Sequence, residues 1–487
     1  MNYSNLEKVS AIPEAASMIE SFRSFGYSVE TAVADIIDNC ISANAKNIYF
    51  NSIWDGDKSY ITITDDGIGM NNEEIIQAMK PGTQNPLARR EENDLGRFGL
   101  GLKTASFSQC RTLSVLSRKK NCKKSYWTWD LDYVNKSHKW ELLKYIPDLF
   151  NNGLDNSTNG TIVVWSNLDR LIPSGTPVSD INSEGNFLEI MEKIKQHIAM
   201  TFHRFLQENK INIFFWEKLI SPWDPFLSEE SATQIFPTDY ISLGATMKGY
   251  VLPHKSKIDE KTYKMAEGFK GWGEQQGFYV YRGKRLLLAG DWLGLFRKEE
   301  HYKLVRIRID LPNTLDADWQ IDIKKSTARP PLVNREQLKA YAMKIRQYGS
   351  DVFRHRGRII KQRAGQEFES LWLDKKKGNK WYFIINRDHS LVKKFKEQAK
   401  EEPEKAIDLM LKFIEETLPS KTIFIKESEQ GNNQKLPFND SSNIILLSVM
   451  KEEYDNQIKN GKTPEEAKQK ISTIEPFNNY PELIDNL

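Results

Sequence analysis

Residues 28–44 have the sequence SVETAVADIIDNCISAN, which predicts the helix around which the first part of the chain is built. Ser28 is a suitable N-cap, with Thr31 in place of the acid that would complete a capping box. Apolar residues recur at helical spacing, at Val29, Val33, Ile36, Ile37, Cys40 and Ile41. The pattern is that of an amphipathic helix.

Two polar residues of this helix, Asp35 and Asn39, are four positions apart and therefore lie on one face, one turn from each other. An amide oxygen can coordinate magnesium, and a carboxylate can orient or deprotonate a water molecule. Taken alone, the pair also fits the polar edge of an ordinary amphipathic helix. The elements that follow in the chain decide between these two interpretations.

Strand-like stretches follow the helix, and a second helix is expected at residues 102–109. The strands are expected at residues 47–53, 60–64, 112–117, 127–131 and 161–165. Short turns join several of them, which indicates a mixed or antiparallel sheet covered by helices. The first region is therefore expected to be an α/β sandwich in an α+β chain.

The segment Asp65-Asp66-Gly67-Ile68-Gly69-Met70 comes directly after the strand at 60–64. A carboxylate at Asp65 can accept a hydrogen bond from an exocyclic amine such as that of adenine. The two glycines would let the backbone approach a flat ligand closely. Taken alone, the segment is equally typical of a turn.

A glycine-rich loop, Gly96 to Thr104, leads into the helix expected at 102–109. Its three glycines expose backbone N–H groups that can bind a polyphosphate, and Lys103 adds a positive charge. The loop is neither a P-loop nor a dinucleotide-binding turn, because the spacing and the preceding strand are absent. Farther along, Asn159-Gly160-Thr161 opens a strand and places the Thr161 hydroxyl where it could contact a base.

In this order, the four elements resemble the GHKL superfamily of gyrase, heat-shock chaperone, histidine kinase and MutL ATPases. The resemblance implies a Bergerat-type ATP-binding sandwich, with Asp35 as general base and Asn39 as magnesium ligand. It implies that ATP is contacted by Asp65, Gly67, Gly69, Met70 and Thr161, and by a lid containing Gly96, Gly99, Leu100, Gly101, Leu102, Lys103 and Thr104.

One position departs from this family, because hydrolytic members usually have Glu as the base where this chain has the shorter Asp35. The departure leaves two alternatives open: slow hydrolysis, or nucleotide binding without useful hydrolysis. Asp38 is a less attractive base, because it is expected to point away from the face of Asp35.

The second region resembles the transducer domain of gyrase, MutL and MORC proteins at Tyr279 to Trp292 and at Trp319 to Ser326. The resemblance implies that a lysine of the latter segment reaches the γ-phosphate. A strand there would turn Lys324 and Lys325 to opposite sides, so that only one of them can do so, and Lys324 is slightly preferred. The whole is similar to bacterial MORC-like ATPases associated with phage defence.

The chain of 487 residues is long enough for several domains, which we expect at residues 1–170, 171–335 and 336–487. The last is expected to be helix-rich, and its role cannot be assigned. A net charge of only +3 gives no global case for nucleic-acid binding. The absence of a signal peptide or long apolar run, and three cysteines without metal spacing, favour a cytoplasmic protein with no membrane contact.

The sequence therefore predicts a magnesium-dependent ATPase that acts as a nucleotide-driven homodimer switch. Its output is expected to be contact with DNA or a separate effector, and the resemblance implies a role in antiviral defence. No intrinsic nuclease is expected, because the seven histidines are scattered. The alternative is a nucleotide-gated binding or scaffold protein with little or no hydrolysis.

Overall fold

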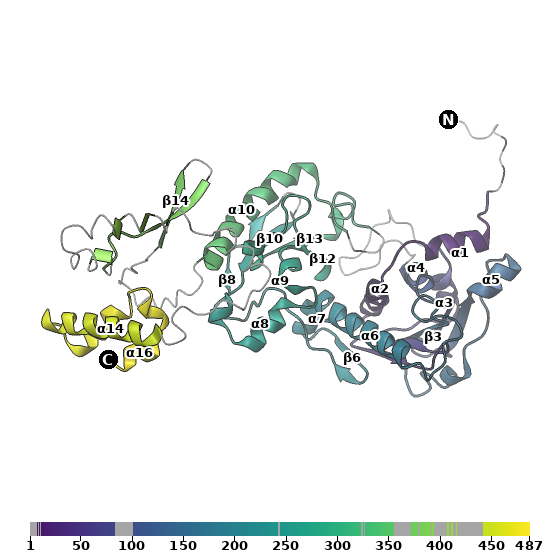
Figure 1. The fold of residues 1–487 in the computed structure, drawn as a ribbon. Coiled ribbons are helices and arrows are strands. Elements are labelled where there is room, and N and C mark those ends of the chain that lie inside the picture. Colours follow the sequence, from purple (N-terminus) through teal and green to yellow (C-terminus); the bar gives the residue numbers. More distant parts are fainter. Residues whose placement is uncertain are drawn as a thin grey trace. The chain divides into compact units, whose positions relative to one another are not determined.

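The computed structural model describes residues 7, 9, 11–82, 101–241, 244–322, 325, 327–354, 372–377, 380–390 and 442–487, with a few positions between 392 and 415. The chain divides into two compact units, residues 1–353 and 354–487, and each is described by itself. The first unit contains two sheets with helices packed around them (Figure 1).

The first sheet has seven strands among the described residues, in the order β4-β3-β5-β2-β1-β6-β7. They are β1 (Asn47–Ile53), β2 (Tyr60–Asp65), β3 (Thr112–Arg118), β4 (Ser125–Asp130), β5 (Gly160–Ser166), β6 (Asn212–Phe215) and β7 (Lys218–Leu219). Only β1 and β6 run parallel among these pairs. The expected mixed sheet is confirmed, and its first five strands lie within two residues of the expected bounds.

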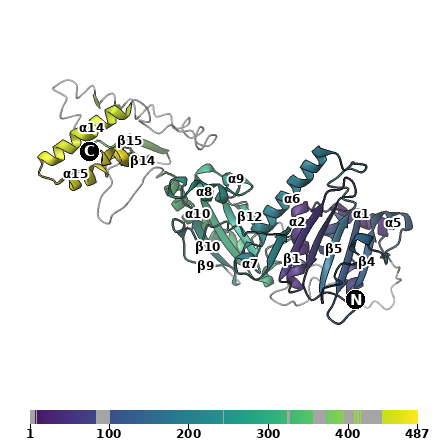
Figure 2. The same cartoon turned by 90° about the horizontal axis from the view of Figure 1, so that it is seen from below.

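Helices cover one face of this sheet (Figure 2). They are α1 (Ala15–Arg23), α2 (Val29–Ser42), α4 (Gly101–Phe107) and α6 (Ile181–Thr201), with α3 (Asn72–Met79) and α5 (Leu131–Ser137) near β4 and α1. Helix α2 is capped by Ser28 as expected, and Val33, Ile36 and Ile37 are buried in the core. Burial of this apolar face against the sheet stabilises α2 and thereby fixes where Asp35 lies.

The second sheet has six strands among the described residues, in the path β12-β11-β13-β10-β8, and β9 also pairs with β10. Its strands are β8 (Gln234–Ile235), β9 (Asp239–Tyr240), β10 (Thr246–Val251), β11 (Gly277–Arg282), β12 (Arg285–Asp291) and β13 (Val305–Leu311). The accompanying helices are α7 (His203–Gln207), α8 (Glu260–Glu267), α9 (Gly271–Glu274) and α10 (Leu332–Arg354). The strands expected near residues 278, 285 and 303 are therefore present.

The expectation of a strand at residues 319–326 is wrong. The described residues there form a compact loop. Gln320 and Lys325 have positive φ values of 45° and 51°, which an extended strand does not allow. The loop is closed by a hydrogen bond from the N–H of Arg329 to the carbonyl of Trp319, at 2.7 Å. Trp319 itself is fully buried in the core of the second sheet.

The packing of the first sheet continues beyond residue 170, the expected domain border. Strands β6 and β7 join that sheet, and its apolar core includes residues up to Ile220. At the other border, helix α10 runs without a break from Leu332 to Arg354. The domain bounds from the sequence remain a proposal, and the layer that carries the candidate site includes residues to about 220.

The second unit contains the hairpin of β14 (Trp372–Lys377) and β15 (Lys380–Ile385), which agrees with the strand pair expected near residue 381. Helices α14 (Ser442–Lys459), α15 (Pro464–Ile471) and α16 (Pro481–Asp485) share a small apolar core. Across the described part of the whole chain, no helix combines the length and the apolar composition needed to cross a membrane.

Replacing Ile37 with Ala tests the packing of α2. Ile37 is fully buried, so the substitution should leave a cavity and lower the free energy of unfolding by about 2–5 kcal/mol. The measurement is urea unfolding followed by tryptophan fluorescence. Ile53→Ala is the matched control, because that side chain is 47% exposed on β1 and should lose far less. Equal losses in the two variants would contradict this packing.

Candidate functional site

Helix α2 presents two buried carboxylates and one exposed amide. Asp35 and Asp38 are 2% and 1% exposed, whereas Asn39 is exposed. The expectation that Asp38 points away from Asp35 is wrong, because residues three apart on a helix are neighbours on its surface. The two acids therefore face the protein interior together, while Asn39 opens to solvent one turn from Asp35.

Two cations from the second sheet region pair with these acids. The Lys325 ammonium lies 2.5 Å from Asp38 Oδ2 and 3.3 Å from Asp35 Oδ1. The Arg285 guanidinium donates from Nε to both oxygens of Asp38, at 3.1 and 2.9 Å, and its Nη2 lies 3.4 Å from Asp35 Oδ1. The structure thus brings together Asp35 and Lys325, two residues that the sequence proposed for one site.

Lys325 is the lysine that reaches this cluster, whereas Lys324, the slightly preferred candidate, lies outside the described residues. Side chains alternate between opposite sides only in a strand, and the described residues here form a loop instead. The positive φ of Lys325 directs the backbone so that its carbonyl also accepts a hydrogen bond from Arg285 Nη1, at 3.2 Å.

Asp35 has two further neighbours. The Tyr27 hydroxyl donates to Asp35 Oδ2 at 3.0 Å, and a Cβ at Gly101, the first residue of α4, would lie 3.9 Å from that oxygen. Burial raises the pKa of Tyr27, so its hydroxyl stays protonated and remains a donor. Burial, and to a lesser extent Asp38, raises the pKa of Asp35, while Lys325 and Arg285 oppose this rise. A carboxylate with a raised pKa is a better proton acceptor.

One observation of the structure supports Asn39 as a magnesium ligand. Its side-chain amide lies at the exposed edge of α2, and it makes no hydrogen bond or ion pair with any residue among those described. Its oxygen is therefore available to a hard cation, which prefers oxygen ligands.

Asp65 ends strand β2 beside Thr161 on the neighbouring strand β5. Its Oδ1 accepts the N–H of Gly67 at 2.8 Å, and its side chain also interacts with the Cys40 thiol of α2. Burial raises the pKa of Asp65 to about 6, although the Gly67 and Cys40 contacts partly oppose this rise. The Asp65 residue as a whole is 6% exposed.

A hydroxyl pair connects Thr161 to the glycine turn. Ser117 Oγ lies 2.9 Å from Thr161 Oγ1 and accepts the N–H of Met70 at 2.8 Å. Gly69 has a φ of +66°, and a Cβ there would lie 1.9 Å from the carbonyl oxygen of Arg118, so only glycine fits. The structure therefore groups Asp65, Gly67, Gly69, Met70 and Thr161 at one end of the neighbouring strands β2 and β5, and their contact with a nucleotide stays a prediction.

The glycine-rich loop is described only in part. Gly96, Gly99 and Leu100 lie outside the described residues, whereas Gly101 to Thr104 form the start of α4. Lys103 is 3% exposed, and its ammonium donates to the carbonyl of Ala78 at 2.8 Å. Burial lowers its pKa to about 8. A contact of Lys103 with phosphate would require this hydrogen bond to break, and it stays a prediction.

Leu102 and Thr104 have packing contacts rather than exposed positions. Leu102 is partly buried against the main core, and Thr104 is fully buried and interacts with the hydroxyl of Tyr27. In this structure Thr104 therefore supports the residue that hydrogen-bonds to Asp35. Direct contact of either side chain with a nucleotide remains a prediction.

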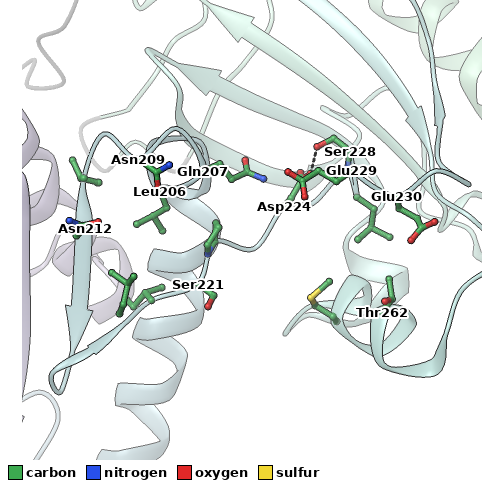
Figure 3. Close-up of a pocket in the computed structure, with 16 residues that line it drawn as sticks. Leu206, Gln207, Asn209, Asn212, Ser221, Asp224, Ser228, Glu229, Glu230 and Thr262 are labelled. Atoms are coloured by element: carbon green, nitrogen blue, oxygen red, sulfur yellow. Dashed lines mark hydrogen bonds between the residues drawn. The ribbon is translucent and has the colours of Figure 1, made fainter.

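A separate pocket of about 620 Å³ lies between α7, strands β6 and β7, and α8 (Figure 3). None of the predicted nucleotide residues line it. Its described lining contains the carboxylates Asp224, Glu229 and Glu230 but no lysine or arginine. A triphosphate would be repelled there, so the cluster on α2 is the better candidate for a nucleotide site.

Sequence reasoning missed Asp38, Arg285, Tyr27 and Ser117 as residues of the site. Helical spacing alone contained the signal for Asp38, which is three residues from Asp35. Arg285 stands next to the apolar run Leu286-Leu287-Leu288, where a charged residue in a strand suggests a buried partner. Tyr27 and Ser117 gave no comparable signal.

Comparison with known proteins found similarity in part of the chain. Residues 27–161 match the family described as histidine kinase-, DNA gyrase B-, and HSP90-like ATPase. The chain is also 28% identical over 89 residues to the ATPase morc-1 of Caenorhabditis elegans. That match covers 18% of this chain and 10% of the worm protein, so most of both proteins lies outside it.

The raised pKa of Asp65 predicts a pH-dependent affinity for adenine nucleotides. Below about pH 6 the carboxyl group becomes protonated and accepts the adenine amine less strongly, so affinity should fall by roughly tenfold as the pH decreases from 7.5 to 5. Isothermal titration with ADP measures this change. Asp65→Asn is the control, because titration of the nucleotide and of Asp35 affects the native protein and this variant alike. Equal pH profiles would contradict the role of Asp65.

Proposed function

We propose, from the premise that residues 27–161 are a GHKL-type ATPase domain, that this protein binds ATP with magnesium and hydrolyses it slowly. The observation that carries the proposal is the meeting of Asp35, from the matched segment, with Lys325, from the second sheet region, at 3.3 Å. A base and a cation for the γ-phosphate are the two groups that such hydrolysis needs from the protein.

In this proposal Asp65 accepts the adenine amine, and the Thr161 hydroxyl contacts the base or a bridging water. Gly67, Gly69 and Met70 form the wall of the base site. Gly96, Gly99, Leu100, Gly101, Leu102, Lys103 and Thr104 belong to the lid over the phosphates. Asn39 holds magnesium, which neutralises phosphate charge when bound.

Asp35 acts as the general base, since it is buried, has a raised pKa and is oriented by Tyr27. It takes a proton from the water that attacks the γ-phosphate, and Lys325 offsets the negative charge of the phosphate oxygens. The Lys325 ammonium also pairs with Asp38, so a phosphate that shares this cation couples nucleotide binding to the interaction between α2 and the second sheet.

We propose that this coupling drives a homodimer switch. On ATP binding the lid and the N-terminal segment would dock on a second copy of the chain, and hydrolysis would release the pair. The output would be contact with DNA or a separate effector protein, in antiviral defence. The resemblance to MORC and MutL proteins supports this extension, and the three free thiols suit a reducing cytoplasm.

A nucleotide-gated binding protein without useful hydrolysis is the second candidate. It is favoured by the short side chain of Asp35, whose carboxylate is already paired with Lys325 and Arg285. In that case ATP would change the contact between the two sheet regions without being consumed.

Substitution of Asp35 separates the two candidates. Asp35→Asn should lower the rate of phosphate release by about 10²- to 10⁴-fold if Asp35 is the base. Asp35→Glu should keep or raise the rate, because the longer side chain is the usual base of the family. Phosphate release by purified protein is measured with ATP and magnesium. A native chain with no turnover, but with measurable affinity for ATP, would support the binding protein instead.

The magnesium role of Asn39 is tested by Asn39→Ala. The affinity for ATP should fall by about tenfold or more in the presence of magnesium, and much less in the presence of EDTA. Thr31→Ala, at the half-buried start of the same helix, is the control. The same loss with and without magnesium would contradict a metal-binding role for Asn39.

The proposed dimer is tested by light scattering with a non-hydrolysable ATP analogue, with and without DNA. The mass should double only when the nucleotide is present, and Asp65→Asn should prevent the change. A mass that does not depend on nucleotide would contradict the switch while leaving ATP binding intact.

A further inference from the structure

Arg285 occupies a distinctive position, because one guanidinium contacts three parts of the candidate site. Nε donates to both oxygens of Asp38, at 3.1 and 2.9 Å, and Nη2 lies 3.4 Å from Asp35 Oδ1. Nη1 donates to the carbonyl of Lys325 at 3.2 Å and to that of Leu286 at 3.1 Å. The residue is 3% exposed and begins strand β12.

We propose that Arg285 is a positioning residue that sets the distance between the base Asp35 and the Lys325 ammonium. The inference rests on the proposed ATP hydrolysis. Arg285 fixes the side chain of Asp38 and the backbone of Lys325 at once, and Asp38 in turn binds the Lys325 ammonium at 2.5 Å. The segment that carries Lys325 is thus fastened to α2 at two points.

The geometry requires an arginine rather than any cation. A guanidinium is planar, permanently charged and has five N–H donors in a fixed arrangement, so it can bind a carboxylate and a carbonyl simultaneously. A lysine at this position would preserve the charge, but it could not keep the contacts with Asp38, with Asp35 and with the Lys325 carbonyl together. Charge and positioning can therefore be separated by one substitution.

Misplacement of Lys325 should affect the reaction more than nucleotide binding. The adenine contacts at Asp65 and Thr161 are made on β2 and β5, which Arg285 does not contact. The base and the phosphate-binding lysine, however, must be aligned closely, and an error of about 1 Å can reduce a rate by about 100-fold. The effect on turnover should therefore exceed the effect on affinity.

A matched control is available in Arg204. This residue also joins a helix near the first sheet, α7, to the second sheet, through its ion pair with Asp310 on β13. It contacts neither Asp35, Asp38 nor Lys325. Arg204→Lys consequently reports what a weakened arginine–carboxylate pair between these layers does by itself.

The experiment compares Arg285→Lys and Arg204→Lys with the native chain. Three quantities are measured: steady-state kcat for ATP, the Kd of a non-hydrolysable ATP analogue, and hydrogen exchange at the amides around Lys325 without nucleotide. In Arg285→Lys, kcat should fall by about 10- to 100-fold and exchange around Lys325 should accelerate, while the Kd changes by less than about threefold. Arg204→Lys should keep the native kcat and exchange.

Native kcat and native exchange in Arg285→Lys would overturn the inference, and so would equal losses in both variants, which indicate a general structural effect. If the native chain does not hydrolyse ATP, the proposed function fails. The exchange comparison still decides whether Arg285 fixes the Lys325 segment.

Discussion

The candidate site depends on a buried cluster of two carboxylates and two cations: Asp35, Asp38, Arg285 and Lys325. Removing an ion from water costs several kcal/mol, and only close partners of opposite charge offset that cost. Here two carboxylates face two cations at 2.5 to 3.4 Å, so the formal charges balance. Loss of any one member would leave an uncompensated buried charge.

This constraint also joins distant parts of the chain. Each contact from α2 to Arg285 and Lys325 spans at least 247 residues. Carboxylates from one sheet layer and cations from the other therefore meet in one cluster. In the proposed reaction, a phosphate that attracts Lys325 removes charge from the acids of α2, so nucleotide binding and the contact between layers affect the same four residues.

The proposed adenine end of the site is built differently. Asp65, Ser117 and Thr161 lie on the neighbouring strands β2, β3 and β5, and backbone pairing sets their positions. Gly69 is required because the carbonyl of Arg118 leaves no room for a side chain. Base recognition is therefore expected to be rigid, whereas the phosphate end contains the ion pairs that can exchange partners.

Local patterns in the sequence were enough to predict helix α2, its Ser28 cap and the first five strands, whereas the grouping of Asp65, Gly67, Gly69, Met70 and Thr161 was implied by the family resemblance. Periodicity and turn residues act over a few positions, and the sheet register then brings the strand ends together. The relation of Asp35 to Asn39 also follows from helix geometry.

Only the tertiary structure decided that Arg285 belongs to the site, and that residues 319–322 and 325 form a loop that brings Lys325 to α2. It also decided that β6 and β7 extend the first sheet. These features depend on contacts between residues far apart in the chain. Their energy comes from pairing charges and apolar surfaces in space, and no local pattern of residues records that pairing.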